Sequence, residues 1–252
     1  MDFTDKVVII TGASSGIGAG AAVYLSTLGA SLVLTGRSEE NLKETAKKCK
    51  GSPLLIVGDV NVDADCVNII KKTIEKFGKL NVLVNNAGMG EGGDITETTL
   101  EQYDLIMSTN VRSVFHLTQL AVPHLVATQG NIVNVSSVAG LRSFPGYLAY
   151  CMSKAALDQF TKCVALDLAP KNVRVNSINP AVIVTDFFRR MGMTDEVREG
   201  FLEKCKETHA LGRVGTVQET AHAIAFLASD HATFITGTQL PVDGGKAIMC
   251  PN

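Results

Sequence analysis

Tryptophan is absent from this chain of 252 residues, and all aromatic residues together make up only 6% of it. The six cysteines form no CxxC pair, and the five histidines show no HExxH or other metal-ligand spacing. No apolar run approaches the roughly 18 residues that a membrane span requires. The net charge is only −2. From these absences we expect no metal site, no membrane span and no broad basic surface for nucleic acid.

The cysteines and the first residues indicate the compartment. No regular spacing relates the cysteines, and a chain of this length can form a large core without disulfides. We therefore expect free thiols at Cys49, Cys66, Cys151, Cys163, Cys205 and Cys250. The first five residues are acidic and lead directly into an apolar segment, so no signal peptide is expected. A cytoplasmic location is the expectation.

Short apolar segments alternate with longer segments of helical period. The apolar segments are rich in Val, Ile and Leu, which is typical of parallel strands covered on both faces. Strands are expected at Val7–Ile10, Ser31–Leu34, Leu54–Val57, Leu80–Val84, Asn131–Val135, Val173–Ile178 and Gln239–Val242. Helices are expected at Ile17–Leu28, Glu39–Cys49, Asp63–Phe77, Leu100–Thr128, Ala149–Leu168 and Val217–Ala228. This alternation predicts an α/β fold: one doubly wound Rossmann domain over residues 1–252, with a seven-stranded parallel sheet flanked by helices.

One connection is longer than the others. Residues 179–215 separate the sixth expected strand from the last helix, on the carboxyl side of the sheet where such folds bind ligands. The stretch around 186–212 is expected to form a substrate lid. The alternative is a surface helical hairpin that packs only for stability.

A glycine-rich segment, TGASSGIG at residues 11–18, joins the first strand to the first helix. Gly12 permits a tight turn, Gly16 lets the backbone approach a pyrophosphate, and Gly18 allows close packing of helix on strand. The free N–H groups at the start of the helix attract phosphate. The segment predicts dinucleotide binding by Gly12, Ser14, Ser15, Gly16, Ile17 and Gly18.

The end of the second strand indicates which dinucleotide binds. NAD sites place a carboxylate there, but this chain has Arg37 and Ser38, which can hold a 2′-phosphate. NADP(H) is therefore expected over NAD(H), although Arg37 can also be read as a solvated surface residue. Asp59 and Val60 follow the third strand, where the aspartate can accept a hydrogen bond from adenine or stabilise a turn.

Two further segments are candidates for the cofactor site and for catalysis. Asn86, Ala87 and Gly88 end the fourth strand, where small residues let the backbone approach a cofactor or form only a turn. Tyr150 and Lys154 are four residues apart on a helix and therefore share one face. A lysine charge nearby is expected to lower the pKa of the tyrosine and make it a proton exchanger. The alternative is a surface contact between two residues of one helix.

Ser137 follows the fifth strand and offers a hydroxyl to a carbonyl oxygen. It lies outside any GxSxG elbow, which disfavours a hydrolase nucleophile.

In combination these motifs resemble the short-chain dehydrogenase/reductase family, particularly its 3-oxoacyl-carrier-protein reductases and related carbonyl reductases. The matching segments occur in order across nearly the whole chain. They are TGASSGIG (11–18), DV (59–60), NNAG (85–88), Asn110, Ser137, the YxxxK pair (150–154), Asn179-Pro180, Thr236-Gly237 and PVDGG (241–245). The family's usual Pro-Gly is Pro180-Ala181 here.

The resemblance implies roles for individual residues. Tyr150 would be the general acid or base, Ser137 would orient the substrate oxygen, and Lys154 would also hold the nicotinamide ribose. Asn110 would order a proton relay, unless it is only a helix kink or a satisfied core amide. The nicotinamide carboxamide would contact Pro180, Ile183 and Thr185. The resemblance also implies a homotetramer that pairs through its two long helices.

The sequence thus predicts an NADP(H)-dependent oxidoreductase that interconverts a ketone or aldehyde and an alcohol. A lipophilic substrate is expected from apolar residues near the pocket, which with Ser137 and Tyr150 are Met89, Phe144, Tyr147 and Phe187. The alternatives are an NAD(H)-dependent alcohol or hydroxysteroid dehydrogenase and a non-catalytic dinucleotide-binding regulator.

Overall fold

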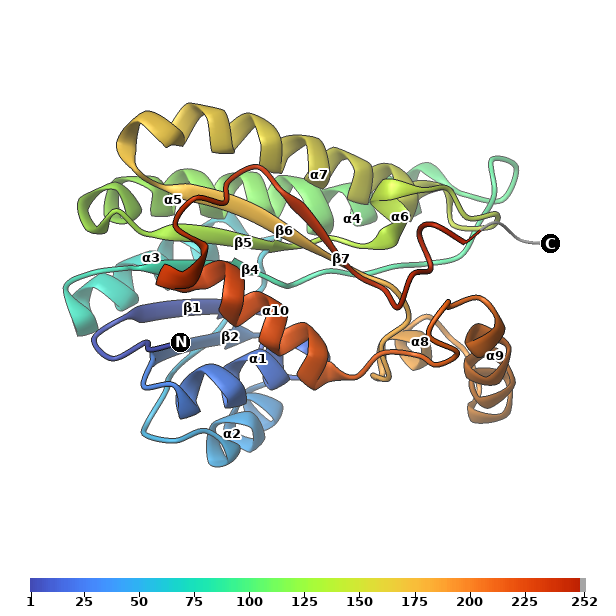
Figure 1. The fold of residues 1–252 in the computed structure, drawn as a ribbon, viewed down its shortest axis with the longest axis horizontal. Helices are drawn as coiled ribbons and strands as arrows, with labels where there is room; N and C mark the ends of the chain where they lie inside the picture. The colour runs from blue at the N-terminus through green and yellow to red at the C-terminus, as the bar shows by residue number, and fades with distance from the viewer. Residues whose placement is uncertain (250–252) are drawn as a thin grey trace.

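The computed structural model describes residues 1–249 and contains one seven-stranded parallel sheet within them (Figure 1). The strands lie in the order β3-β2-β1-β4-β5-β6-β7. Their bounds are β1 Val7–Thr11, β2 Ser31–Gly36, β3 Leu54–Val57, β4 Val82–Asn85, β5 Asn131–Val135, β6 Arg174–Pro180 and β7 Gln239–Val242. The predicted doubly wound Rossmann-type fold is confirmed.

The order of the strands reverses between β1 and β4, which pair in parallel with Val8 opposite Val82. Crossovers on the two sides of this point run in opposite directions along the sheet, and folds of this type bind ligands in a crevice at the carboxyl ends of the strands beside such a reversal. All five residues of β1 and all four of β4 are buried, which explains why these segments are almost continuously apolar.

Helices cover both faces of the sheet, as Figure 1 shows with α7 and α5 above it and α1, α2 and α10 below. One apolar core joins the sheet to α1 and α10, and the other joins it to α3, α5 and α7. The bounds are α1 Gly16–Thr27, α2 Glu39–Lys48, α3 Asp63–Phe77, α4 Leu100–Met107, α5 Ser113–Thr128, α6 Val138–Leu141, α7 Leu148–Leu168, α8 Phe187–Arg190, α9 Asp195–Glu207 and α10 Val217–Ala228. The short 3-10 helices are η2 Ala169–Lys171 and η3 Asp230–Ala232.

The expectation of one α-helix over Leu100–Thr128 is wrong in its middle. A π-helical turn, η1 Ser108–Arg112, separates α4 from α5. The wider turn accommodates an extra residue and directs Asn110 inward, where its amide is fully buried and hydrogen-bonded. Apolar periodicity does not report such a turn, because the helix keeps its buried face on both sides of it.

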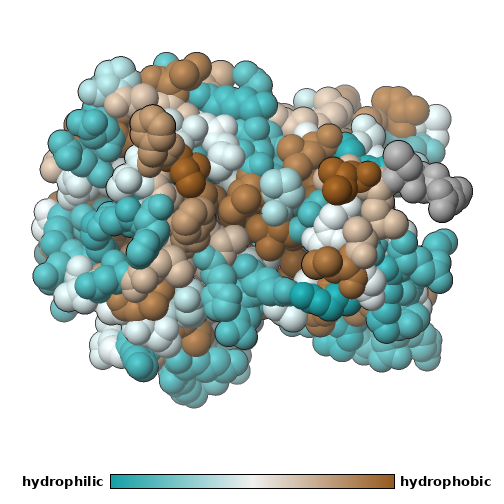
Figure 2. All heavy atoms as spheres, in the orientation of Figure 1, coloured by the Kyte–Doolittle hydropathy of each residue, from teal (hydrophilic) through white to brown (hydrophobic). Residues whose placement is uncertain are grey.

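The long connection after β6 contains the short helix α8 and the longer α9, which form a lobe beside the sheet (Figure 1). Figure 2 shows hydrophobic and hydrophilic residues mixed over the face in view, with a hollow at its lower edge between this lobe and the rest of the molecule. Among residues 1–249, no helix combines the length and apolarity needed to cross a membrane.

Five of the expected free thiols are confirmed, and the sixth, Cys250, lies outside the described residues.

Close packing of α1 on α10 gives a test of the core. A Cβ at Gly20 of α1 would overlap the Cγ1 of Val217 on α10, whereas a Cβ at Gly200 of α9 would meet nothing within 4 Å. We expect Gly20→Ala to lower the free energy of unfolding by about 1–3 kcal/mol through overpacking. Gly200→Ala should raise it by up to about 1 kcal/mol, because alanine is the better helix former. Urea titration of the two variants checks this, and equal effects would contradict it.

Candidate active site

The glycine-rich loop after β1 is fastened to the segment that follows β4. The Nδ2 of Asn86 donates to the carbonyls of Thr11 (2.8 Å) and Gly12 (3.2 Å). In return, the Oγ1 of Thr11 accepts from the backbone N–H groups of Asn86 (3.0 Å) and Ala87 (2.9 Å). A Cβ at Gly18 would collide with Asn86 and with the carbonyl oxygen of Gly12. The structure thus brings together two motifs that lie about 75 residues apart.

This loop fits a dinucleotide. Gly12 has a φ of +63° and Gly16 a φ of +55°, a region that L side chains rarely adopt. The twelve-residue helix α1 begins at Gly16, so its first N–H groups face the crevice and favour phosphate. Thr185, in the loop after β6, lies opposite Gly16, since its Cγ2 is 3.4 Å from where a Cβ on that glycine would stand. The glycine-rich loop, predicted to bind the pyrophosphate, and the loop after β6, predicted to contact the nicotinamide, therefore lie next to each other.

Asn110 and Lys154 converge on Gly88. A Cβ on Gly88 would stand 3.2 Å from the Oδ1 of Asn110 and 3.6 Å from the Nζ of Lys154. The Oδ1 of Asn110 accepts from the N–H of Met89 (2.9 Å), and its Nδ2 donates to the carbonyl of Met89 (2.8 Å). The Nζ of Lys154 donates to the carbonyl of Val135 at the end of β5 (3.0 Å). These bonds satisfy the Asn110 amide and fix both side chains.

Tyr150 and Ser137 complete the predicted group of four. Tyr150 lies in the first turn of α7, with its ring centroid 5.7 Å from the Nζ of Lys154. The Nδ2 of Asn110 donates to the Oγ of Ser153 (3.0 Å), which itself donates to the carbonyl of Tyr150 (2.7 Å). Ser137 is the N-cap of α6, and its Oγ accepts from the N–H of Ala139 (3.1 Å).

Burial dominates the electrostatics of this group. It raises the pKa of Tyr150 to about 12, against the opposing effect of a hydrogen bond with Ser137. It lowers the pKa of Lys154 to about 8, with Asp158 acting in the opposite direction. The expected lowering of the Tyr150 pKa by Lys154 is therefore not seen in this structure, because burial penalises the phenolate and outweighs every opposing effect on this group. Tyr150 keeps its proton at neutral pH.

The predicted adenosine-side residues lie at the ends of β2 and β3. The Nη1 of Arg37 is 3.9 Å from the Oδ2 of Asp59, and the Arg37 side chain is 79% exposed. The Oδ1 of Asp59 accepts from the N–H of Asn61 (2.9 Å), which is the turn role expected as its alternative. The Oγ of Ser38 accepts from Asn41 and caps α2, and the carbonyl of Val60 accepts from Cys66.

The predicted nicotinamide-side residues surround the end of β6. Pro180 is its last residue and pairs with Val242 of β7. Ile183 forms an isolated bridge with Gly215. The Oγ1 of Thr185 accepts from the N–H of Phe187 (3.2 Å), so the loop turns directly into α8.

Of the predicted substrate residues, Phe187 lies against Tyr150. Their ring centroids are 6.0 Å apart, and both rings approach Gly90. Phe187 also contacts Phe188, which contacts Phe201 of α9, so an aromatic row connects the lobe to the tyrosine.

The other three predicted substrate residues have different neighbours. The Sδ of Met89 is 3.5 Å from the Oγ1 of Thr109, and Tyr147 bridges to Gly93. The ring of Phe144 faces the cations of Arg142 and Lys246.

A family model described as enoyl-(acyl carrier protein) reductase matches residues 12–247. The meso-2,3-butanediol dehydrogenase of Serratia marcescens is 37% identical over 246 residues, covering 97% of this chain and 96% of that protein. The 3-oxoacyl-(acyl-carrier-protein) reductase of Thermotoga maritima is 37% identical over 252 residues, covering 98% and 100%. A solved Caenorhabditis elegans short-chain dehydrogenase/reductase of unknown function, with cofactor, is 37% identical and covers 98% of this chain and 97% of its own, with a TM-score of 0.91.

The chain belongs to the short-chain dehydrogenase/reductase family. It is an oxidoreductase that acts on carbonyl and alcohol groups.

Sequence reasoning missed one buried acid of this dehydrogenase/reductase. The two carboxylate oxygens of Asp158 accept from the Nδ2 of Asn179 (3.1 and 2.9 Å), and burial raises the pKa of this carboxyl. The same Nδ2 donates to the carbonyl of Ser137 (2.9 Å). Asp158 therefore supports the backbone of Ser137 and the charge of Lys154. The available signal was its spacing, four residues beyond Lys154 on the same helix face.

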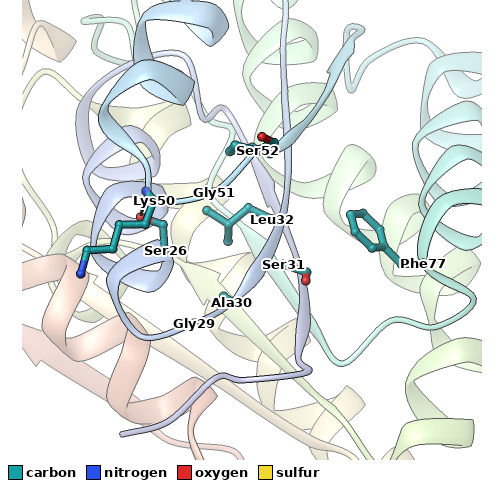
Figure 3. Close-up of a pocket in the computed structure, with 10 residues that line it drawn as sticks. Ser26, Gly29, Ala30, Ser31, Leu32, Lys50, Gly51, Ser52 and Phe77 are labelled. Carbon is teal, nitrogen blue, oxygen red and sulfur yellow. Dashed lines mark hydrogen bonds between the residues drawn. The ribbon is translucent and has the colours of Figure 1, made fainter.

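A cavity of about 360 Å³ lies elsewhere in the dehydrogenase/reductase, at the amino ends of β2 and β3 (Figure 3). Ser26, Lys50 and Phe77 are among the residues around it, and the backbone N–H of Lys50 already donates to the Oγ of Ser26 (2.8 Å). None of the predicted site residues lines it, since these lie at the carboxyl ends of the strands.

The buried Lys154 gives a pH test. Between its folded-state pKa of about 8 and the unfolded value near 10.4, the unfolded chain binds one more proton than the folded chain. The free energy of unfolding should therefore rise with pH across this window, by about 1.4 kcal/mol per pH unit from this group. We expect the free energy of unfolding of the wild type, minus that of Lys154→Met, to rise by about 3 kcal/mol from pH 7.5 to 10.5.

Denaturant titrations of both proteins at matched pH check this. Taking their difference cancels groups that titrate in the window without interacting with Lys154, among them Cys66, whose pKa burial raises to about 11. A difference that does not change with pH would contradict the buried state of Lys154.

Proposed function

We propose that this chain is an NADP(H)-dependent reductase that converts a ketone or aldehyde to an alcohol, and can act in reverse. The observation that carries the proposal is the convergence of Asn110 and Lys154 beside Gly88, with Tyr150 next to Lys154, at the crevice that the glycine-rich loop borders. A regulator without turnover would have no need to fix these side chains in one buried network.

When bound, the nicotinamide cofactor supplies the hydride. Tyr150 would hold a proton at its hydroxyl and donate it to the carbonyl oxygen as negative charge develops there. Its raised pKa keeps that proton in place at neutral pH, and a developing alkoxide is a stronger base than a phenolate. The Ser137 hydroxyl would orient the same oxygen.

Lys154 would hold the nicotinamide ribose and stabilise the phenolate that remains after proton transfer. The hydrogen bond from its Nζ to the carbonyl of Val135 fixes the position of the ammonium group. Asn110 would keep the Met89 backbone and α7 in register through its bonds to Met89 and Ser153.

Arg37 supports the preference for NADP(H). It stands at the end of β2, where NAD-binding folds place a carboxylate, and most of its side chain is exposed to solvent. A guanidinium there offers charge-assisted bonds to a 2′-phosphate.

A small lipophilic carbonyl compound is the proposed substrate. Phe187 places an apolar ring beside Tyr150, and two relatives are named for 2,3-butanediol and for 3-oxoacyl groups.

We also propose a cytoplasmic homotetramer. Exposed apolar side chains on the long helices support pairing through that face, namely Leu105, Phe115, Met152 and Leu166.

Replacing Tyr150 by Phe removes the proton donor but keeps the ring. We expect kcat for carbonyl reduction to fall by at least about 10²–10⁴, with the dissociation constant for NADPH within about twofold. Tyr103→Phe on α4 is the matched control and should keep full activity. Steady-state kinetics against a panel of carbonyl compounds, with NADPH binding by fluorescence, checks this. Near-parental turnover of Tyr150→Phe would reject the assignment, and a wild type without turnover would favour the regulator.

Replacing Arg37 by Asp tests the cofactor preference. A charge-assisted bond contributes about 1.5–3 kcal/mol, so NADPH affinity should fall roughly ten- to a hundredfold relative to NADH. Lys43→Asp makes the same charge change on exposed α2 and should leave the ratio unchanged. Titration of each variant with both coenzymes gives the ratio. If Arg37→Asp keeps the wild-type ratio, the NAD(H)-dependent alternative gains support.

A further inference from the structure

The loop of residues 142–147 connects two parts of the catalytic group. It starts after α6, whose N-cap is Ser137, and ends at α7, which carries Tyr150 in its first turn. Its backbone also pairs with the segment after β4, where the N–H of Gly93 donates to the carbonyl of Gly146 (2.8 Å). The position of this loop therefore affects the shape of the substrate entrance.

The C-terminal segment Asp243–Met249 is bonded to this loop. The Nη1 of Arg142 donates to the carbonyls of Lys246 (2.8 Å) and Met249 (2.9 Å). The guanidinium carbon of Arg142 lies 5.6 Å from the ring centroid of Phe144, and the Nζ of Lys246 lies 5.7 Å from it. Both distances are within the range of a cation–π contact. Phe144 is thus held by one cation from its own loop and one from the C-terminal segment.

The same segment is bonded to the end of the lobe. The Nζ of Lys246 donates to the Oγ1 of Thr208, just after α9 (2.6 Å), and the N–H of Leu211 donates to the carbonyl of Gly244 (3.0 Å). Gly245 packs so closely that a Cβ on it would stand 2.7 Å from the Cβ of Ala210. Lys246 therefore touches both walls of the entrance: the loop 142–147 and the end of α9.

The segment has a fixed local shape. The Oδ1 and Oδ2 of Asp243 accept from the N–H groups of Gly245 (2.9 Å) and Ala247 (2.7 Å), which closes a turn after β7. A cavity of about 250 Å³ lies beside Asp243 and Gly244, between β7 and residues 209–215. Apolar packing on that side is incomplete, so the polar contacts of Arg142 and Lys246 contribute much of the connection.

We propose that Asp243–Met249 acts as a strap that joins the loop 142–147 to the end of α9 and so sets which carbonyl substrates the enzyme accepts. Arg142 and Lys246 are positioning residues in this device, since they act through Phe144 and through backbone carbonyls. The proposal rests on the proposed function for its substrates. In Figure 1 the chain after β7 runs along the end of the molecule between α9 and the loops near α6, as the strap requires.

The strap holds the far end of a lobe whose near end carries Phe187. The aromatic row of Phe187, Phe188 and Phe201 connects α9 to Tyr150. Releasing the strap should therefore loosen both walls at once and admit bulkier substrates less selectively, without altering the glycine-rich loop.

The test compares Arg142→Met with Arg174→Met. Arg174 also donates from its guanidinium to backbone carbonyls, those of Leu227 (2.9 Å) and Ser229 (3.1 Å), but at the opposite end of the sheet. We expect Arg142→Met to lower the ratio of kcat/KM for butane-2,3-dione over kcat/KM for the bulkier ethyl 3-oxooctanoate at least fivefold, mostly through KM. The NADPH dissociation constant should stay within twofold. Lys246→Met should shift the ratio in the same direction, and Arg174→Met should leave it unchanged even if it lowers stability.

Hydrogen exchange separates the strap from the proposed function, because it needs no turnover. Amides of residues 142–149 and 208–212 should exchange at least tenfold faster in Arg142→Met, and at the wild-type rate in Arg174→Met. Unchanged exchange at 208–212 in Arg142→Met overturns the strap. Faster exchange with an unchanged substrate ratio overturns its role in specificity. A wild type that reduces neither substrate nor any other carbonyl refutes the proposed function, while the exchange rates still decide whether the strap exists.

Discussion

The hydrogen bonds between Asn86 and the backbone of Thr11 and Gly12 fasten the end of β1 to the segment after β4, beside the pairing of β1 and β4 that joins the two halves of the sheet. They bring the loop after β1 against the loop after β4, where the strand order reverses. The approach is so close that Gly18 has no room for a side chain. Everything that borders the crevice is placed relative to this junction, including Gly88 and the side chains of Asn110 and Lys154 that surround it.

The group around Gly88 is a buried polar network, and burial of such groups is costly unless their bonds are made. The structure makes them: the Asn110 amide is bonded on both sides, Lys154 has a carbonyl partner, and Asp158 accepts from Asn179. The remaining electrostatic cost appears as shifted pKa values of Tyr150 and Lys154. A network of this kind fixes side chains before substrate arrives, which is what proton transfer at a defined atom requires.

The proposed substrate entrance differs from the crevice in how it is built. It would be formed by three segments remote in sequence: the loop 142–147, the lobe of α8 and α9, and the C-terminal segment. Their contacts are few and polar or aromatic, such as those of Phe144 with Arg142 and Lys246. Such contacts are easier to change than a core, which lets one scaffold accept different carbonyl compounds while its cofactor crevice stays the same.

The sequence by itself determined the sheet, its flanking helices and the glycine-rich loop, and it supplied the residues that are proposed as the catalytic group. These follow from local signals, since apolar runs, glycine spacing and residues four apart on a helix act within one element. Only the tertiary structure decided the π-helical turn at Asn110, the raised pKa of Tyr150, the role of Asp158 and the place of Phe144 beside the C-terminal segment. Each of these depends on burial or on contacts between segments distant in the chain, and neither quantity is carried by periodicity or by a motif.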